Sequence, residues 1–520
     1  MFIAAAAGQL GESDVAAKAA ADLVKFRPEL PALMPAQVAK IWNTEYGGRF
    51  LEGLRKAGLD ILDDEAAAAA PSSGPSSGPA SAKSPSSGIR TKTPSGQARA
   101  EEGFWVAVLP FRYRGGDADL AALADGLTDE VITGLSRFSY LQVIARGSTA
   151  KYSSEAQGAG QGHGQSQDVR AIGKELGARY VMEGNLRQAG TKLRLVVQLV
   201  DTVTGAHLWA ETYEREFRRD AVFDLQDDLA PRIVSTVADQ YGVLPRTMSD
   251  TLSGKSEELL TPHEAWLRAF SYFGRMTPVE HATVRRILEK AVRDAPDQAD
   301  CWALLSTMYA IEFADEFNPL PNSLDRALAA AQRAVALAPA HALTHYSLAW
   351  AHFFRKEKSA FYAAAERAMA LNPMDGSGMG ILGIFMQSAG EPDRGMRMVE
   401  RAMELNPNYP SVLRFAAFTE TYFKGKYEEA LDAAVRLNMP GFYFTHSSLA
   451  AVLGQLGQRE AAQKAVKDLL ALRPDFAKEM RREYAKWNTA EEIELVVEGL
   501  RKAGLEVEGE AGSAAVKWTG

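Results

Sequence analysis

The spacing of apolar residues divides the chain near residue 260, because the period of the pattern changes there. Within residues 103–242, the apolar runs at 104–111 and 141–145 are typical of buried strands, whereas 119–139 has apolar residues at helical spacing. A second helix, three strand-like segments joined by turns, and a helix at 221–241 follow. This order, β-α-β-α-β-β-β-α, predicts a mixed sheet with helices on one face.

From residue 262 onward, strand signals vanish and prolines recur at a nearly constant interval. Successive prolines are 43, 34, 34, 33 and 34 residues apart, and most follow similar helix ends such as AMALNP and AMELNP. A 34-residue period with a proline after the second helix is typical of tetratricopeptide (TPR) repeats. We therefore predict an α-solenoid of about five TPR repeats over 260–475, with an inserted loop at 312–323 and capping helices over 476–507. The prolines are Pro296, Pro339, Pro373, Pro407, Pro440 and Pro474.

The N-terminal segment repeats the end of this array. The matched phrases are EGLRKAGL at 52–59 and 498–505, GQLG at 8–11 and 454–457, and Trp-Asn-Thr at 42–44 and 487–489. Residues 1–62 are therefore predicted to be a partial TPR unit plus its capping helix, a copy of 448–508. Because this copy lacks neighbouring repeats, we expect it to dock on an exposed solenoid end, in the same chain or in another, which would allow self-association. The sequence leaves open whether Met1 is the true start.

Two stretches have the composition of linkers. The Ser, Pro, Gly and Ala of AAAAAPSSGPSSGPASAKSPSSG (66–88) cannot bury enough apolar surface to offset the entropy of ordering, so we predict a disordered linker over 63–102. The Gly/Gln-rich stretch 155–167 is predicted to be a loop inserted within the domain that follows this linker, residues 103–242. Residues 508–520 are expected to form a disordered tail.

Composition narrows the classes of function. The net charge of −8 argues against broad nucleic-acid binding, and we expect no nucleic-acid partner. One cysteine, Cys301, excludes an intramolecular disulfide and a zinc site built on cysteines. No stretch approaches 18 apolar residues, so the sequence predicts no membrane span. These features favour a cytoplasmic protein.

The sequence does not contain a convincing catalytic, cofactor or metal motif. LSGKS (252–256) lacks the earlier glycine of a phosphate-binding loop, and His263-Glu264 is followed by Leu267 where a zinc motif needs a second histidine. His341 and His345 share a helix face but have no third ligand nearby in the sequence. We therefore predict a non-enzymatic protein without a cofactor or bound metal.

The candidate partner-binding residues lie on the predicted TPR helices. Tyr346, Trp350 and Phe353 cluster on the first helix of the unit near 342–373, where side chains face either the groove or the neighbouring helix. One interpretation is that these rings form core between repeats, and the other is that they line a groove for a peptide. Together with Gln387 and Gln455, they are our candidates for contact with a protein or peptide partner.

Residues 104–226 resemble a known family, the TolB amino-terminal-like (FlgO-like) domain of bacterial multidomain proteins. The resemblance rests on VAVLPF (106–111), ADGLTDEVITGLSR (124–137), LQVIAR (141–146), IGKELGARYVMEGNLRQAG (172–190), QLVDTVTGAHLWAETYER (198–215) and DLQDDLA (224–230). It implies a TolB-N-like α/β domain over 103–242. In that family the domain is commonly followed by TPR repeats, and the pair often sits behind a class III adenylate/guanylate cyclase domain or a DNA-binding winged helix.

The expected fold class is therefore α+β plus all-α. The leading functional hypothesis is a scaffolding protein whose TPR groove binds a peptide or partner domain and whose α/β domain is regulatory. The alternative is the regulatory part of a class III adenylate/guanylate cyclase system that lacks the catalytic domain in this chain. A third hypothesis, by analogy with TolB and FlgO, is an envelope-associated accessory protein.

Overall fold

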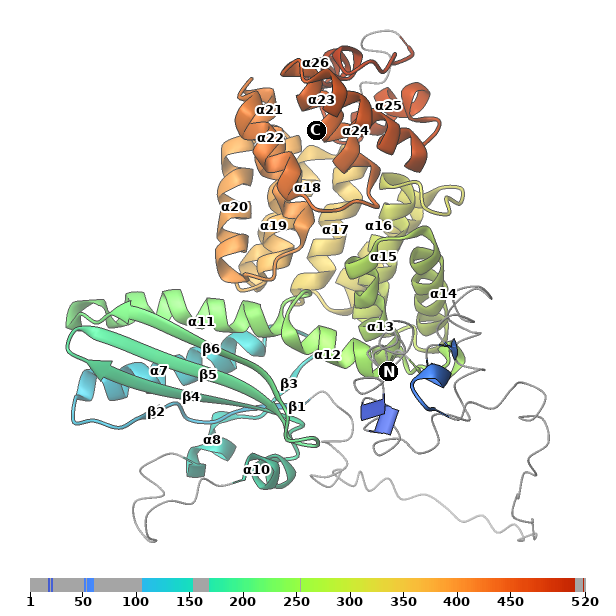
Figure 1. The fold of residues 1–520 in the computed structure, drawn as a ribbon. Coiled ribbons are helices and arrows are strands. Elements are labelled where there is room, and N and C mark those ends of the chain that lie inside the picture. Colours follow the sequence, from blue (N-terminus) through green and yellow to red (C-terminus); the bar gives the residue numbers. More distant parts are fainter. Residues whose placement is uncertain are drawn as a thin grey trace, which may run out of the picture. The chain divides into compact units, whose positions relative to one another are not determined.

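The computed structural model describes most of the chain beyond residue 104 and short pieces before it (Figure 1). The described residues are 17, 18, 20, 21, 51, 52, 54–59, 105–152, 168–252, 254–509 and 518. The chain divides into two compact units, Met1–Thr91 and Lys92–Gly520. The predicted linker at 63–102 and the predicted loop at 155–167 lie outside the described residues.

The α/β domain is built on a mixed sheet. Its strands are β1 (Trp105–Val108), β2 (Arg112–Tyr113), β3 (Gln142–Val143), β4 (Tyr180–Ala189), β5 (Lys192–Asp201) and β6 (His207–Glu216). The strand order is β3-β1-β4-β5-β6, with β2 beside β4. β1 runs parallel to β3 and β4, whereas β4, β5 and β6 form an antiparallel meander. The predicted strand pattern and mixed sheet are thus present.

Helices cover both faces of this sheet, so the expectation of helices on one face was wrong. Alternate residues of β1 explain the two layers, because successive side chains in a strand point to opposite faces. Val106 and Val108 join the core formed with α7 (Ala118–Leu135) and α11 (Val222–Ala238). Ala107 instead packs with Ile172 of α10 (Val169–Leu176). The short α8 (Arg146–Thr149) lies between β3 and α10 in the chain.

The helical array follows, linked by α12 (Val243–Leu252). Six successive helix pairs run from α13 to α24, and α25 (Phe476–Ala485) and α26 (Ala490–Lys502) end the array (Figure 1). Counting intervals between prolines finds only five units, because the first pair precedes Pro296. The pairs are α13 (Pro262–Arg275) with α14 (Pro278–Asp294), α15 (Ala299–Ala314) with α16 (Ser323–Leu337), α17 (Ala342–Phe354) with α18 (Lys358–Leu371), α19 (Gly376–Ser388) with α20 (Pro392–Leu405), α21 (Arg414–Phe423) with α22 (Tyr427–Arg436), and α23 (Tyr443–Gln455) with α24 (Arg459–Leu472).

The α/β domain packs on the array through α11. The Arg232 guanidinium donates to the Glu404 carbonyl at 2.5 Å, and Thr236 Oγ1 donates to the Leu405 carbonyl at 3.4 Å. Asn406, which follows α20, donates from Nδ2 to the buried carboxylate of Asp239, which follows α11, at 2.8 Å. These bonds satisfy polar groups at the C-terminal end of α20, which would otherwise lack helical partners. The domain and the array therefore share one packed body.

The EGLRKAGL phrase ends in the same local structure in both copies. After α26, Gly504 has φ of +92° and its amide donates to the Arg501 carbonyl at 2.9 Å. In the first unit, Gly58 has φ of +88° and its amide donates to the Arg55 carbonyl at 2.9 Å. A left-handed glycine after the last helical turn is a common helix stop. The remainder of the predicted N-terminal copy lies largely outside the described residues.

Candidate functional site

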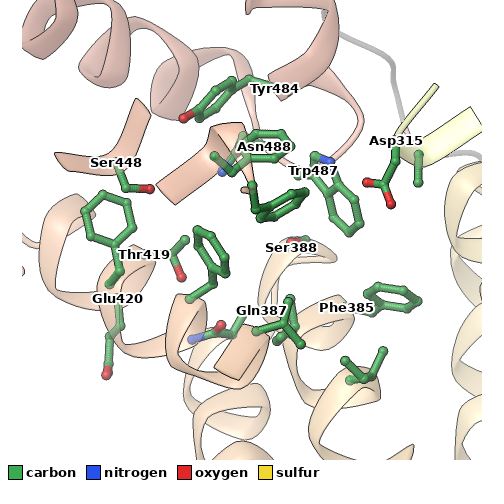
Figure 2. A pocket seen from close by; sticks show the side chains of 18 of the residues that line it. Asp315, Phe385, Gln387, Ser388, Thr419, Glu420, Ser448, Tyr484, Trp487 and Asn488 are labelled. Carbon is green, nitrogen blue, oxygen red and sulfur yellow. The ribbon is translucent and has the colours of Figure 1, made fainter. Parts of the chain in front are cut away.

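The inner face of the array encloses an aromatic pocket of about 340 Å³ (Figure 2). Its wall comes mainly from the first helix of each pair. Representative lining residues are Phe273 of α13, Ile311 of α15, Trp350 of α17, Phe385 of α19, Phe418 of α21 and Phe444 of α23. Pockets of this volume with mostly apolar walls and a few polar groups are typical of ligand-binding sites.

The repeat period explains how these side chains converge. Phe385 follows Trp350 by 35 residues, and Thr419 follows Phe385 by 34, so equivalent turns of successive first helices face the same interior. The Trp350 and Phe385 rings pack edge to face with centroids 4.9 Å apart. Gln387 and Thr419 add polar groups to this largely apolar wall (Figure 2).

The five candidates from the sequence fall into two groups. Tyr346, Trp350 and Gln387 line the pocket. Phe353 lies outside it, stacked on Phe385 with ring centroids 4.2 Å apart, and therefore forms core between repeats. Gln455 also lies outside the pocket, where it accepts a hydrogen bond from Lys502 of α26 at 2.7 Å.

The C-terminal helices close one side of the pocket by contacting the turn after α15. Glu316 in that turn accepts hydrogen bonds from Arg473 at 2.9 Å, from Lys486 at 3.3 Å and from Arg482. Burial acts to raise the pKa of Glu316, but its hydrogen bond from Arg482 and the nearby cations lower that pKa to about 2. We call Glu316, Arg473, Arg482, Glu483 and Lys486 the closing cluster.

A second contact of the C-terminal wall involves the turn between α17 and α18. Lys356 of that turn is buried, and its Nζ donates to the Lys486 carbonyl at 2.6 Å. Burial lowers the pKa of Lys356 to about 8. Trp487, the residue after Lys486, packs on Phe354 and Phe385, with ring centroids 5.0 and 6.0 Å apart. The C-terminal end of the array thus contacts α17 and α19 through the Trp487 ring.

The α/β domain reaches the same pocket. Gln240 and Tyr241, which follow α11, are lining residues, and Tyr241 Oη donates to the Phe273 carbonyl of α13 at 3.4 Å. A change in the position of α11 would therefore alter the wall of the pocket.

Asp315 is a pocket residue that the sequence did not reveal. Sequence spacing placed it inside a loop at 312–323, but α15 continues to Ala314 and Asp315 is its C-terminal cap. Its side chain lies on the side of the pocket where Trp487 and Phe385 also lie (Figure 2). Desolvation raises the pKa of Asp315 to about 7, an effect that Lys486 opposes and Glu483 reinforces.

The two histidines considered as metal ligands in the sequence have ordinary structural contacts. His341 Nδ1 lies 3.4 Å from the Asp300 carboxylate, and His345 Nε2 lies 2.9 Å from the Pro339 carbonyl. Within the residues that the structure describes, there is no group of three His, Cys, Asp or Glu side chains that could hold a metal ion. In the same residues, each helix is too short or too polar to cross a bilayer.

Comparison with known proteins gives two sequence matches. Residues 102–232 match the family model described as HilA/YgeH-like transcriptional regulator, second domain, which does not confirm the TolB amino-terminal-like resemblance. A protein of Rhizobium meliloti (strain 1021) named "Putative adenylate cyclase 3" is 32% identical over 249 residues, covering 47% of this chain and 40% of that protein. The chain therefore spans about 40% of the length of this relative.

Two solved structures are also similar in part. "Crystal structure of YrrB: a TPR protein with an unusual peptide-binding site" is 20% identical and covers 36% of this chain and 93% of that chain, with a TM-score of 0.25. "Crystal structure of MamA protein" is 20% identical and covers 41% and 94%, with a TM-score of 0.20. These scores are too low to support an inference about this chain.

Proposed function

We propose that this chain is a non-enzymatic scaffold whose inner pocket binds an apolar peptide segment of a partner protein. The supporting observation is the pocket itself, because rigid aromatic rings from successive repeats surround about 340 Å³ of largely apolar space. Such rings anchor peptides effectively, since they bury a large area at a small loss of conformational entropy. On this proposal Tyr346, Trp350 and Gln387 contact the partner.

We further propose that the α/β domain is a regulatory module, in the manner of the TolB amino-terminal-like family. Tyr241 and Gln240 support this role, because they belong to the domain and also line the pocket. A ligand of the α/β domain that shifted α11 would change the affinity of the pocket for peptide. Peptide binding would in turn change the affinity for that ligand by the same factor.

The peptide proposal can be tested by obstructing the pocket in the full chain. A panel of capped hexapeptides rich in Phe, Leu and Trp would be screened for binding by fluorescence anisotropy. Ser388→Trp adds a ring inside the pocket, whereas Ser359→Trp adds the same ring on the exposed side of α18. We expect Ser388→Trp to weaken binding by about tenfold or more and Ser359→Trp to leave it unchanged. Equal affinities for the two variants would contradict the proposal.

A second candidate function is the regulatory part of a class III adenylate/guanylate cyclase system, and the relative from Rhizobium meliloti favours it. The purified chain would be added to that relative, and the rate of cyclic AMP formation from ATP would be measured. A change in rate that saturates with added chain would support this function. Cyclic-nucleotide formation by the chain alone would instead contradict the non-enzymatic proposal.

A further inference from the structure

A carboxylate on the pocket wall has no bonding partner among the residues that the structure describes. Asp315 is 7% exposed, and across the described parts of the chain its carboxylate oxygens take part in neither a hydrogen bond nor an ion pair. Burying an unpaired carboxylate is costly, and buried charges in proteins are normally paired. The pocket in front of Asp315 is the space from which a partner could come.

Lys486, the cation that acts electrostatically on Asp315, already has hydrogen-bond partners. An ammonium group has three N–H donors. Those of Lys486 are directed to three other acceptors, namely the Glu483 carboxylate at 2.9 Å, the Glu316 carboxylate at 3.3 Å and the Ala314 carbonyl at 3.3 Å. Lys486 therefore lowers the cost of the Asp315 charge through space but donates no hydrogen bond to it.

Aromatic rings lie on the same side of the pocket as Asp315. Figure 2 shows its carboxylate on the side of the pocket where Trp487 and Phe385 lie, and Trp350 packs on Phe385. Trp487 Nε1 is buried and, within the described residues, has no hydrogen-bond acceptor. Ring faces attract cations, and this attraction is strengthened where water is excluded. A carboxylate among such rings is suited to a cation that carries apolar groups.

We propose that Asp315, Trp487 and Phe385 form a subsite for a lysine or arginine side chain within an otherwise apolar peptide segment. This inference rests on the proposed peptide-binding function and adds the chemistry of one contact within it. The cation would pair with the Asp315 carboxylate, and a peptide carbonyl would accept from Trp487 Nε1. The net charge of −8 would also favour the approach of a basic segment.

The subsite should depend on pH. The groups that face Asp315 electrostatically are Lys486 and Glu483 of the closing cluster, Tyr272 of α13 and Tyr443 of α23. With its pKa near 7, the Asp315 carboxyl group is largely neutral at pH 5.5 and largely charged at pH 8. Lysine remains charged at both values. A lysine peptide should therefore bind more tightly at pH 8.

The test compares two peptides and two charge-matched variants of the full chain. The peptides are acetyl-Ala-Phe-Lys-Leu-Ala-amide and its norleucine counterpart, which keeps the apolar stem without the charge. Asp315→Asn removes the proposed partner, and Asp294→Asn removes one negative charge on the exposed side of α14. Titration calorimetry at pH 5.5 and pH 8 gives the affinities, and phenethylammonium is titrated as a free amine.

We expect the lysine peptide to bind at least about tenfold more tightly than the norleucine peptide at pH 8. Asp315→Asn should remove this preference and the pH dependence, whereas Asp294→Asn should keep both. Equal binding of the two peptides to the parent protein would overturn the lysine subsite while leaving the peptide pocket standing. Failure of both peptides would overturn the subsite and count against the proposed function. Binding of phenethylammonium alone would contradict a peptide source.

Discussion

At the scale of single residues, Asp315 is held in a position that stabilises the fold poorly. Its pKa of about 7 in the folded protein exceeds the usual value for aspartate of about 3.9, so the folded state retains a proton that the unfolded state loses. Stability therefore falls as pH rises between these two values, and the full cost is present above pH 7. Residues kept at a cost in stability are common at functional sites.

This reasoning predicts the behaviour of Asp315→Asn without any ligand. At pH 8 the variant should be more stable than the parent by about 1–3 kcal/mol, because the neutral amide avoids the cost of a buried charge. At pH 4 the two proteins should be nearly equal in stability. Urea denaturation at both pH values measures the difference. Asp220→Asn, which alters an exposed ion pair with Arg218, serves as the control. A variant less stable than the parent at pH 8 would show that the charge makes favourable contacts.

At the scale of helices, close contact between glycines joins the capping helix to the last repeat. A methyl group on Gly454 of α23 would lie 2.0 Å from the Gly499 carbonyl of α26, and one on Gly499 would lie 2.5 Å from the Ala451 carbonyl. Both glycines belong to the phrases shared with the N-terminal segment, GQLG and EGLRKAGL. The repeated phrases therefore contain the glycines that allow α23 and α26 to pack closely.

Gly454→Ala should destabilise the protein by about 1–3 kcal/mol, because the added methyl group forces two backbones apart. The expected result is a lower melting temperature together with faster hydrogen exchange in α26. Gly147→Ala is the control, since a methyl group there meets no atom within 4 Å. Unchanged exchange in α26 would mean that the two helices can separate without cost.

Much of the helical layout could be predicted because its signals are local and periodic. The 34-residue interval predicted the helix pairs, and Thr489 with Glu492 forms a capping box at the start of α26. For Tyr346 and Trp350 the sequence left two interpretations open, core or groove, and both side chains line the pocket. The role of Asp315 could not be predicted in this way. It depends on the closing cluster, in which residues more than 150 positions apart meet.

The face covered by α10 was also beyond local patterns. The amphipathic pattern of an eight-residue helix indicates that one of its faces packs on another element. The pattern does not indicate which face of the sheet that helix covers. That choice depends on Ala107 and Val181, whose side chains make the second face of the sheet apolar near Ile172. The sequence of β1 does not distinguish its two faces, because the strand is buried on both and is therefore a continuous apolar run.

At the scale of the whole molecule, the pocket depends on the closing cluster, which joins the turn after α15 to the C-terminal end of the array. Removing Glu316 takes away one of the two carboxylates that Arg473, Arg482 and Lys486 share and leaves all three with Glu483 alone within the closing cluster. We expect Glu316→Ala to cost on the order of 2 kcal/mol. Hydrogen exchange should quicken in α25 and at the end of α15, and apolar peptides should bind more weakly. Asp220→Ala is the control, because its pair with Arg218 is exposed. Exchange confined to the substituted turn would argue against closure by this cluster.

The N-terminal unit allows a last prediction about assembly. Leu54 and Leu59 are buried in the first unit, as Leu500 and Leu505 are in the C-terminal cap, so the two copies bury the same face. If the first copy docks on a solenoid end of another chain, sedimentation should give a mass above that of a monomer, and deletion of 1–62 should restore the monomer. If it docks within its own chain, deletion should lower the melting temperature at constant mass. Leu54→Asp should reproduce either effect, whereas Lys56→Asp, on the exposed side of the same helix, should not. Unchanged mass and unchanged melting temperature after deletion would show that this segment docks on neither, because a buried apolar face cannot be removed without cost.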